Sequence, residues 1–175
     1  MTMRANDVLE VLDALDGAGV SAWVNGGWGV DALLEEERRT HRDLDIVLGV
    51  DDVPPLIVTL GRQGFTEVRT WPDSPESFVL ADALDRQVDV HPVRFDTQGN
   101  GVQRIQRGEW TYPAAGFAGR GTIGGRQVFC LTPEVQVMTH GGYELDDDDF
   151  NDMAALEARF GVELRPHQRR SDCAD

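Results

Sequence analysis

The chain has 175 residues, enough for one compact domain with a buried core but too few for two independent domains. Its 31 acidic and 16 basic residues give a formal net charge of −15, which repels nucleic-acid backbones and attracts cations. No apolar run reaches the length of a membrane span and the N-terminus lacks a signal peptide's apolar segment, so we expect a cytoplasmic protein without membrane or nucleic-acid partners.

Hydrophobic spacing in the first third of the chain predicts helices and strands around a glycine turn. Apolar residues recur at helical spacing after Asn6, a residue type that caps helices, whereas SAWVN before the glycines is typical of a short strand. The predicted elements are a helix over 8–15, a strand over 21–25, a turn at 26–29, a helix over 30–37, a strand over 43–48 and a helix over 54–60.

The second part of the chain predicts strands, a glycine-rich stretch and two helices. Strands are expected over 65–70, 77–81 and 86–95, and the stretch 98–126 predicts only loops with one hairpin near IGGRQV. Helices are expected after the N-cap Thr132 and over 150–160, where Gly161 ends the pattern. Cys130 is expected in the core and Cys173 in a polar tail, with neither a disulfide framework nor metal-ligand spacing.

This order of elements predicts an α/β fold. We expect a small mixed twisted sheet flanked by helices, with a short C-terminal helical lobe. The core is expected over residues 1–128, the lobe over 129–166 and a disordered tail over 167–175. The cleft between core and lobe is the expected site, and the protein is expected to be a monomer or a homodimer.

Three aspartates are candidates for chemistry. Asp43 and Asp45 alternate with apolar residues in DLDIVL, so both acids project from one face of a half-buried strand. Asp89 occupies a similar place in QVDVHPV. Phosphoryl transfer requires charge neutralisation, which carboxylates achieve by holding two Mg²⁺ ions about 4 Å apart. We therefore expect Asp43, Asp45 and Asp89 to bind metal, and Asp89 also to act as the catalytic base.

A second group of residues is suited to a triphosphate. Gly26 and Gly27 stand between a strand and a helix, where backbone N–H groups and the helix N-terminus favour phosphate oxygens. Arg39 offers a rigid fork of donors, and His41 can donate to a phosphate or orient a carboxylate. These four residues are therefore expected to bind the nucleotide.

Each feature alone has a simpler interpretation. Among 31 acidic residues a D-x-D pair arises easily by chance, and GGWG alone is more often a tight turn. The run from Asp146 to Asp149 is most simply the solvated start of a helix, and His91 and His140 are more often structural than ligands. The order of features, from strand and double glycine to D-x-D strand and lone acid, favours a nucleotidyltransferase.

The segments VNGGWGVDALL, RRTHRDLDIVL and QVDVHPV resemble the aminoglycoside and lincosamide nucleotidyltransferases of the polymerase-beta-like superfamily. The similarity runs from about residue 21 to residue 161 and includes LTPEVQVMTHGGYELDDDDFNDM, which resembles the family's C-terminal helical segment. By position, the resemblance implies triphosphate contacts at Gly26 and Gly27. It also implies Mg²⁺ ligands at Asp43 and Asp45 and the third acid at Asp89.

The chain departs from the family at one position. Relatives often carry a basic residue, able to reach the phosphates, where this chain has Asp148. The net charge and the aspartate run favour a cationic acceptor, an aminoglycoside before a lincosamide. Its expected contacts are Tyr143, Asp148 and Asp149.

The sequence therefore predicts Mg²⁺-dependent transfer of a nucleoside monophosphate, AMP from ATP first, to a hydroxyl of a small-molecule antibiotic. One alternative is a nucleotide-binding or antitoxin-like protein without turnover, which the acid at position 148 motivates. Another is a dinucleotide-binding oxidoreductase, because Gly27, Gly29 and Ala32 match G-x-G-x-x-A, with Asp45 or Asp51 as the ribose acid. That fold needs a longer chain and leaves the third aspartate unexplained.

Overall fold

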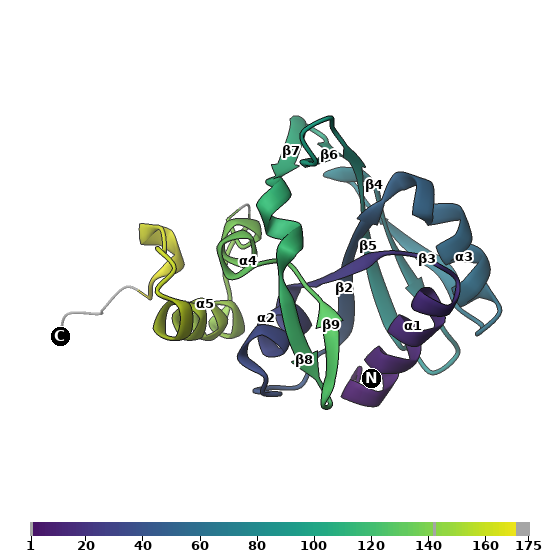
Figure 1. Ribbon diagram of the computed structural model, residues 1–175, viewed down its shortest axis with the longest axis horizontal. Coiled ribbons are helices and arrows are strands. Elements are labelled where there is room, and N and C mark those ends of the chain that lie inside the picture. Colours follow the sequence, from purple (N-terminus) through teal and green to yellow (C-terminus); the bar gives the residue numbers. More distant parts are fainter. Residues whose placement is uncertain (1, 142, 171–175) are drawn as a thin grey trace.

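The computed structural model describes residues 2–141 and 143–170, and it forms a mixed β-sheet flanked by helices (Figure 1). The α-helices are α1 (Ala5–Gly17), α2 (Gly26–Leu34), α3 (Val53–Gly61), α4 (Pro133–Thr139) and α5 (Asp147–Phe160). The strands are β1 (Ala22–Asn25), β2 (Asp43–Gly49), β3 (Thr66–Trp71), β4 (Ser74–Ala81), β5 (Gln87–Phe95), β6 (Gly101–Ile105), β7 (Gly108–Tyr112), β8 (Arg120–Ile123) and β9 (Arg126–Phe129). The predicted α/β class with a mixed sheet is confirmed.

The register of the sheet sets the geometry of the later site. The strand order is β1-β2-β5-β4-β3, with β6 pairing to β5 and β7 to β6, while β8 and β9 form a separate hairpin. β2 and β5 are parallel neighbours, and their register places Asp45 beside Asp89. β1 runs antiparallel to β2 and places Asn25 beside Asp45. Three polar residues from three strands therefore lie in one row across the sheet.

The alternation along β2 and β5 divides the core into two faces. Leu44, Ile46 and Val88 are fully buried in the larger apolar cluster, which also receives α1 and α3. Val47 and Val93 point into a smaller cluster on the opposite face. Burying each of these side chains contributes about 1.5–3 kcal/mol, so both faces resist a shift of register. The acids are held on the face of the smaller cluster.

Helix α2 begins four residues earlier than predicted. It starts at Gly26 rather than at residue 30 and ends at Leu34, where Glu35 adopts a left-handed conformation with φ of 59°. Asn25 is the extended N-cap, so the glycines are the first helical residues instead of a separate turn. Helix α1 likewise begins at Ala5 rather than after Asn6, because Asp7 accepts a hydrogen bond from the Arg4 backbone N–H at 2.9 Å.

The glycine-rich stretch contains more structure than predicted. The hairpin near IGGRQV is confirmed as β8 and β9, with Gly124 and Gly125 both at positive φ. A second hairpin, β6 and β7, was missed and corrects the expectation of loops. Its buried polar residue Gln103 donates to Ser77 Oγ at 2.8 Å and accepts from the Tyr112 hydroxyl at 2.9 Å. The hairpin was missed because a polar side chain that is buried by hydrogen-bond partners on other strands does not contribute to an alternating apolar pattern in the sequence.

The C-terminal helices lie at the opposite end of the molecule from α1 and α3 (Figure 1). Asp146 caps α5 by accepting from the Asp149 N–H at 3.0 Å, and Gly161 ends the helix at φ of 68°, as the sequence predicts. Within the expected disordered tail, Gln168 is buried and donates to Val137 O at 2.6 Å, whereas residues 171–175, including Cys173, fall outside the described residues. In the part of the chain that the structure describes, no helix is long and apolar enough to cross a membrane.

Candidate active site

A cleft of about 540 Å³ lies between the sheet and the C-terminal helices. It is lined by the end of β1, the start of α2, the segment before β2, strands β2 to β7 and helix α4. Its lining residues from the predicted site are Gly26, Gly27, Arg39, His41, Asp43, Asp45, Tyr143 and Asp149. The fold therefore gathers the predicted nucleotide residues, the D-x-D pair and two of the predicted acceptor residues into one cavity.

An acidic cluster forms where β2 and β5 pair. One oxygen each from Asp45 and Asp89 and a ring nitrogen of His91 lie within 4.8 Å of one another. His91 Nε2 is 3.3 Å from Asp45 Oδ1 and 3.7 Å from Asp89 Oδ1. Asp43 lines the same cleft but is not a member of this triad. The cluster thus includes a histidine that the sequence favoured as structural.

Burial and mutual repulsion favour protonation of these acids. Burial raises the pKa of Asp89 to about 6, with the carboxylates of Asp45 and Asp43 acting in the same direction and His91 and Trp71 opposing them. Burial and then Asp45 also raise the pKa of Asp43. A bound cation would relieve this repulsion, and a set of carboxylate oxygens with one imidazole suits Mg²⁺ or Mn²⁺. The residues therefore fit a divalent metal.

Trp71 covers the third acid. Its indole Nε1–H lies 3.0 Å from both oxygens of Asp89, whose residue is only 6% exposed and does not line the cleft. One N–H is shared between the two oxygens, so each oxygen keeps a lone pair for a further partner. Trp71 is the last residue of β3, just beyond the predicted strand, and nothing in its local sequence indicated the contact.

The two glycines at the start of α2 have different neighbours. A Cβ at Gly26, which has φ of 60°, would overlap Asp45 Oδ2. A Cβ at Gly27 would overlap Arg39 Nη2 and His41 Nδ1. The start of the helix is therefore in contact with the acids on one side and with the basic residues on the other. A phosphate at this N-terminus would meet backbone N–H groups and the positive end of the helix dipole.

His41 is held by a buried acid that sequence reasoning missed. His41 Nε2 lies 2.6 Å from Asp31 Oδ2, and the two residues are 3% and 2% exposed. Asp31 Oδ2 also accepts from the Arg38 backbone N–H at 3.2 Å. The imidazole is therefore oriented with Nδ1 toward Gly27. The sequence carried one signal for this buried acid, since an aspartate stands within the apolar helix segment VDALL, one turn after Gly27.

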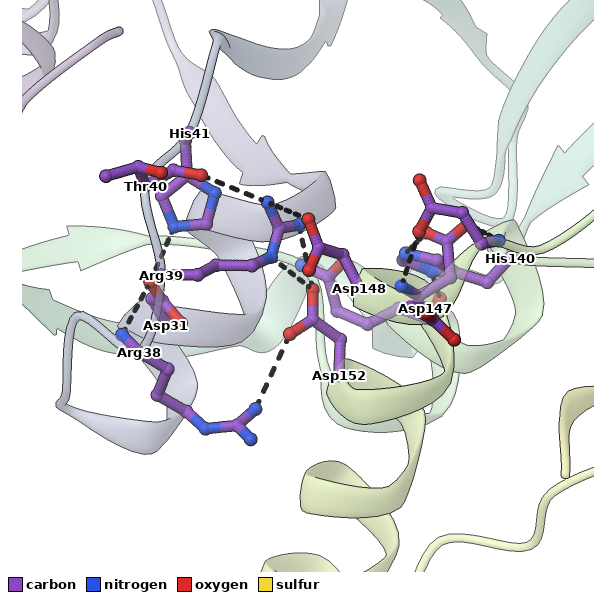
Figure 2. A network of polar contacts seen from close by, with 12 residues as sticks. Asp31, Arg38, Arg39, Thr40, His41, His140, Asp147, Asp148 and Asp152 are labelled. Carbon is purple, nitrogen blue, oxygen red and sulfur yellow. Dashed lines mark hydrogen bonds and ion pairs between the residues drawn. The ribbon is translucent and has the colours of Figure 1, made fainter. Parts of the chain in front are cut away.

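Arg39 reaches across to α5 (Figure 2). Its Nε and Nη2 atoms donate to Asp152 Oδ2 at 3.2 and 2.9 Å. Its Nη1 atom is 3.8 Å from Asp148 Oδ2. Asp148, a predicted acceptor contact, does not line the cleft, because its side chain faces Arg39 at the surface. The structure therefore places Asp148 on the side of the basic residues.

The remaining predicted residues form the opposite wall. The Tyr143 hydroxyl donates to Asp149 Oδ1 at 3.0 Å, and His140 Nε2 lies 3.6 Å from the same oxygen. His140 Nδ1 is 2.7 Å from the Gln136 carbonyl oxygen, which fixes the buried ring, as expected of a structural histidine. Ile105 and the indoles of Trp71 and Trp110 add an aromatic and apolar surface.

The arrangement around Gly29 differs from that of a dinucleotide site. A Cβ at Gly29 would overlap Gln136 Nε2 and lie 3.0 Å from Val24 O. This glycine therefore serves the packing of α2 against α4, not the approach of a cofactor. The G-x-G-x-x-A match has a structural explanation here.

Relatives of the chain carry out antibiotic resistance functions. The chain is 28% identical to a lincosamide resistance protein of Staphylococcus haemolyticus over 89% of its length and 99% of that protein. It is 24% identical to a 2''-aminoglycoside nucleotidyltransferase of Escherichia coli over 81% of its length and 75% of that protein.

Solved structures of antibiotic adenylyltransferases also resemble this chain. The lincomycin-bound lincosamide antibiotic adenylyltransferase LnuA superposes with a TM-score of 0.78 at 26% identity, covering 90% of this chain and 99% of LnuA. ANT(2'')-Ia in complex with adenylyl-2''-tobramycin shares the fold, with a TM-score of 0.71 at 18% identity, over 88% of this chain and 87% of that one. The predicted nucleotidyltransferase fold and enzyme class are confirmed. Because the family model for aminoglycoside-2''-adenylyltransferase matches residues 7–156, the chain belongs to that family.

Proposed function

We propose that the protein transfers an adenylyl group from ATP to a hydroxyl of a lincosamide or aminoglycoside antibiotic, with Mg²⁺ required. The observation that carries this proposal is the cluster of Asp45, Asp89 and His91, whose members Asp45 and His91 line the same cleft as the glycine start of α2. Acids for a cation and backbone donors for a phosphate are the two halves of a nucleotidyl-transfer site.

The nucleotide is proposed to bind at the start of α2. Gly26 and Gly27 let the start of α2 lie directly against Asp45 and the basic residues, because a Cβ at either position would overlap their side chains. The backbone N–H groups of this helix start would bind phosphate oxygens. Arg39 and His41, both against Gly27, supply further donors. Mg²⁺ held by Asp43, Asp45 and Asp89 would neutralise the charge of the triphosphate and of the attacking oxygen.

The transfer is proposed as an in-line displacement at the α-phosphorus. The acceptor hydroxyl oxygen forms the new P–O bond, the bond to the bridging oxygen breaks and pyrophosphate leaves. Asp89 takes the hydroxyl proton, for which its raised pKa of about 6 is suited near neutral pH. The Trp71 indole N–H, 3.0 Å from both Asp89 oxygens, would orient the carboxylate in this role.

The acceptor is proposed to be a lincosamide before an aminoglycoside, which reverses the order that net charge suggested. The lincosamide resistance protein matches this chain over 99% of its own length, compared with 75% for the aminoglycoside enzyme. The cleft also offers an apolar wall of Trp71, Ile105 and Trp110, and its acids outside the D-x-D pair are Asp73 and Asp149. A lincosamide, with one amine and apolar groups, suits this surface better than an aminoglycoside with several amines.

Mass spectrometry of antibiotics incubated with protein, Mg²⁺ and ATP tests the proposal. We expect a mass gain of one adenylyl group on a lincosamide, together with release of pyrophosphate. GTP, CTP and UTP in parallel reactions test the nucleotide preference. Reaction of an aminoglycoside alone would restore the order that net charge suggested, and no product from either antibiotic class would contradict the proposal.

A second candidate is a nucleotide-binding protein without turnover. It is favoured by the contact of Asp148 with Arg39 and by the indole over Asp89, because both engage groups that catalysis needs. Calorimetry that detects binding of ATP with Mg²⁺, while no adenylylated product forms from a broad acceptor panel, would support this candidate over the enzyme.

A further inference from the structure

Asp152 is a buried carboxylate with two arginine partners. Its side chain on α5 is 1% exposed, whereas the side chains of Arg38 and Arg39 are 29% and 26% exposed. Oδ2 accepts both hydrogen bonds from Arg39, and Oδ1 accepts from Arg38 Nη1 at 3.4 Å. A carboxylate removed from water needs such partners, so the contact with the arginines is strongly preferred over an unpaired state.

The contact determines where the Arg39 guanidinium lies. Arg39 belongs to the irregular segment between α2 and β2, so no helix or strand orients its side chain. Its Nε and Nη2 atoms are directed to Asp152, and the same Nη2 atom packs against Gly27. The position of the guanidinium beside the glycine start of α2 therefore depends on a residue of the C-terminal helix.

Asp148 approaches the same arginine from a different position. It precedes Asp152 by one helical turn, is 58% exposed and lies 3.8 Å from Nη1, the atom that Asp152 leaves free. Solvent screens an exposed pair of this kind, so it orients the side chain weakly. The same Nη1 atom also donates to the Thr40 carbonyl oxygen at 3.5 Å. A phosphate bound to this guanidinium would therefore compete with Asp148 for its positive charge.

We propose that Asp152 is a positioning residue for nucleotide binding, which holds Arg39 against the start of α2, and that Asp148 competes with the nucleotide for the same guanidinium. The inference rests on the proposed function, because it takes the triphosphate to bind at Gly26 and Gly27. It assigns opposite effects to two aspartates of the same helix, one buried and one exposed.

The test is the affinity for a non-hydrolysable ATP analogue with Mg²⁺, measured by calorimetry without any acceptor. Asp152→Asn keeps the shape of the side chain but removes its charge, and we expect about tenfold weaker binding or more. Asp148→Asn should improve the affinity, by up to about threefold, and an unchanged affinity would contradict the competing role. In turnover, Asp152→Asn should raise KM for ATP much more than it lowers kcat.

A double-mutant cycle separates positioning from a structural role. If Asp152 acts through Arg39, Asp152→Asn should have little further effect on affinity in an Arg39→Gln background. Arg38→Gln is the matched control, because it removes another ion pair of the same carboxylate but no group that lines the cleft. Thermal unfolding of each variant shows which ones are folded. If Asp152→Asn does not fold, Asp152→Glu replaces it in the cycle.

The outcomes separate this inference from the proposed function. Three results would each overturn the positioning role alone. They are full additivity of the two substitutions in the cycle, equal losses of affinity in Arg38→Gln and Asp152→Asn, and wild-type affinity in folded Asp152→Asn. A loss of affinity in Asp148→Asn would overturn the competing role of Asp148. A wild-type protein that binds no ATP would overturn both the inference and the proposed function.

Discussion

The acidic and basic sides of the cleft are held in place by different parts of the fold. Asp45 and Asp89 are paired in the register of two parallel strands, and apolar neighbours on both faces prevent that register from shifting. Arg39 lies in an irregular segment and takes its position from Asp152, 113 residues later in the chain. The acids are therefore placed by the sheet, and the arginine by the docking of a helix.

This difference predicts how substitutions divide between turnover and binding. Changes to the acids should lower kcat most, because the sheet would keep its shape while the chemistry is lost. Changes around Arg39 should act mainly on nucleotide affinity.

Removal of the metal should have the largest effect. Without a cation, the acids of the cleft would repel the triphosphate, so treatment with EDTA should lower turnover by at least about 10³-fold. Addition of Mg²⁺ in excess should restore the rate, which shows that the protein was not damaged. Undiminished turnover after exhaustive chelation would remove the metal from the acidic side.

Asp89→Asn should lower kcat by roughly 10²–10⁴-fold, because the amide cannot take the proton of the acceptor. Its nucleotide affinity should stay within about threefold of wild type, since Asp43 and Asp45 would still hold a cation. Asp45→Asn is the comparison and should damage both quantities. Steady-state kinetics and calorimetry of the two variants measure this split, and near-wild-type turnover in Asp89→Asn would exclude Asp89 as the base.

The pH dependence should follow Asp89. Its pKa is raised to about 6, so the carboxylate is protonated as the pH falls through that value, and the site loses both a base and a metal ligand. Mg²⁺ affinity should therefore decrease below a pH of about 6, by roughly tenfold per unit for one group, and turnover at subsaturating Mg²⁺ should decrease with it. Trp71→Phe removes a donor that favours the charged form and should move the midpoint upward. A flat profile between pH 5 and 8 would contradict this assignment.

Gly27→Ala should test the contact between the helix start and the basic residues. The new methyl group would displace Arg39 and press on the buried ring of His41, so KM for ATP should rise roughly tenfold with a smaller change in kcat. Gly17→Ala is a suitable control, because a methyl group there meets no atom of the described residues within 4 Å. Equal KM values for the two variants would show that Gly27 does not approach the nucleotide.

Asp148→Lys should have the smallest effect. The exposed position tolerates the substitution, and the change removes an acid that contacts Arg39 while restoring the charge that relatives often carry. Turnover should remain within about threefold of wild type, with nucleotide binding equal or tighter. A large fall in kcat would mean that Asp148 serves the acceptor, as its sequence position first suggested.

The sequence by itself determined the features that depend on short-range periodicity. Alternation in DLDIVL placed Asp43 and Asp45 on one face of a strand, and the double glycine before an apolar helix indicated the phosphate side. These features are legible because a strand repeats every two residues and a helix every 3.6, so a few neighbouring residues define a face. Several strand positions and the end of the last helix at Gly161 follow from the same local patterns.

Only the tertiary structure decided which side chains complete the site. Three contacts join separate elements, or an element and a distant loop. They are the hydrogen bonds of Trp71 with Asp89, of Asp31 with His41 and of Asp152 with Arg39. Periodicity shows that a residue is buried or exposed, but not which partner it meets. The physical reason is that a buried polar group takes its partner from whatever the packing of helices and strands brings within hydrogen-bonding distance.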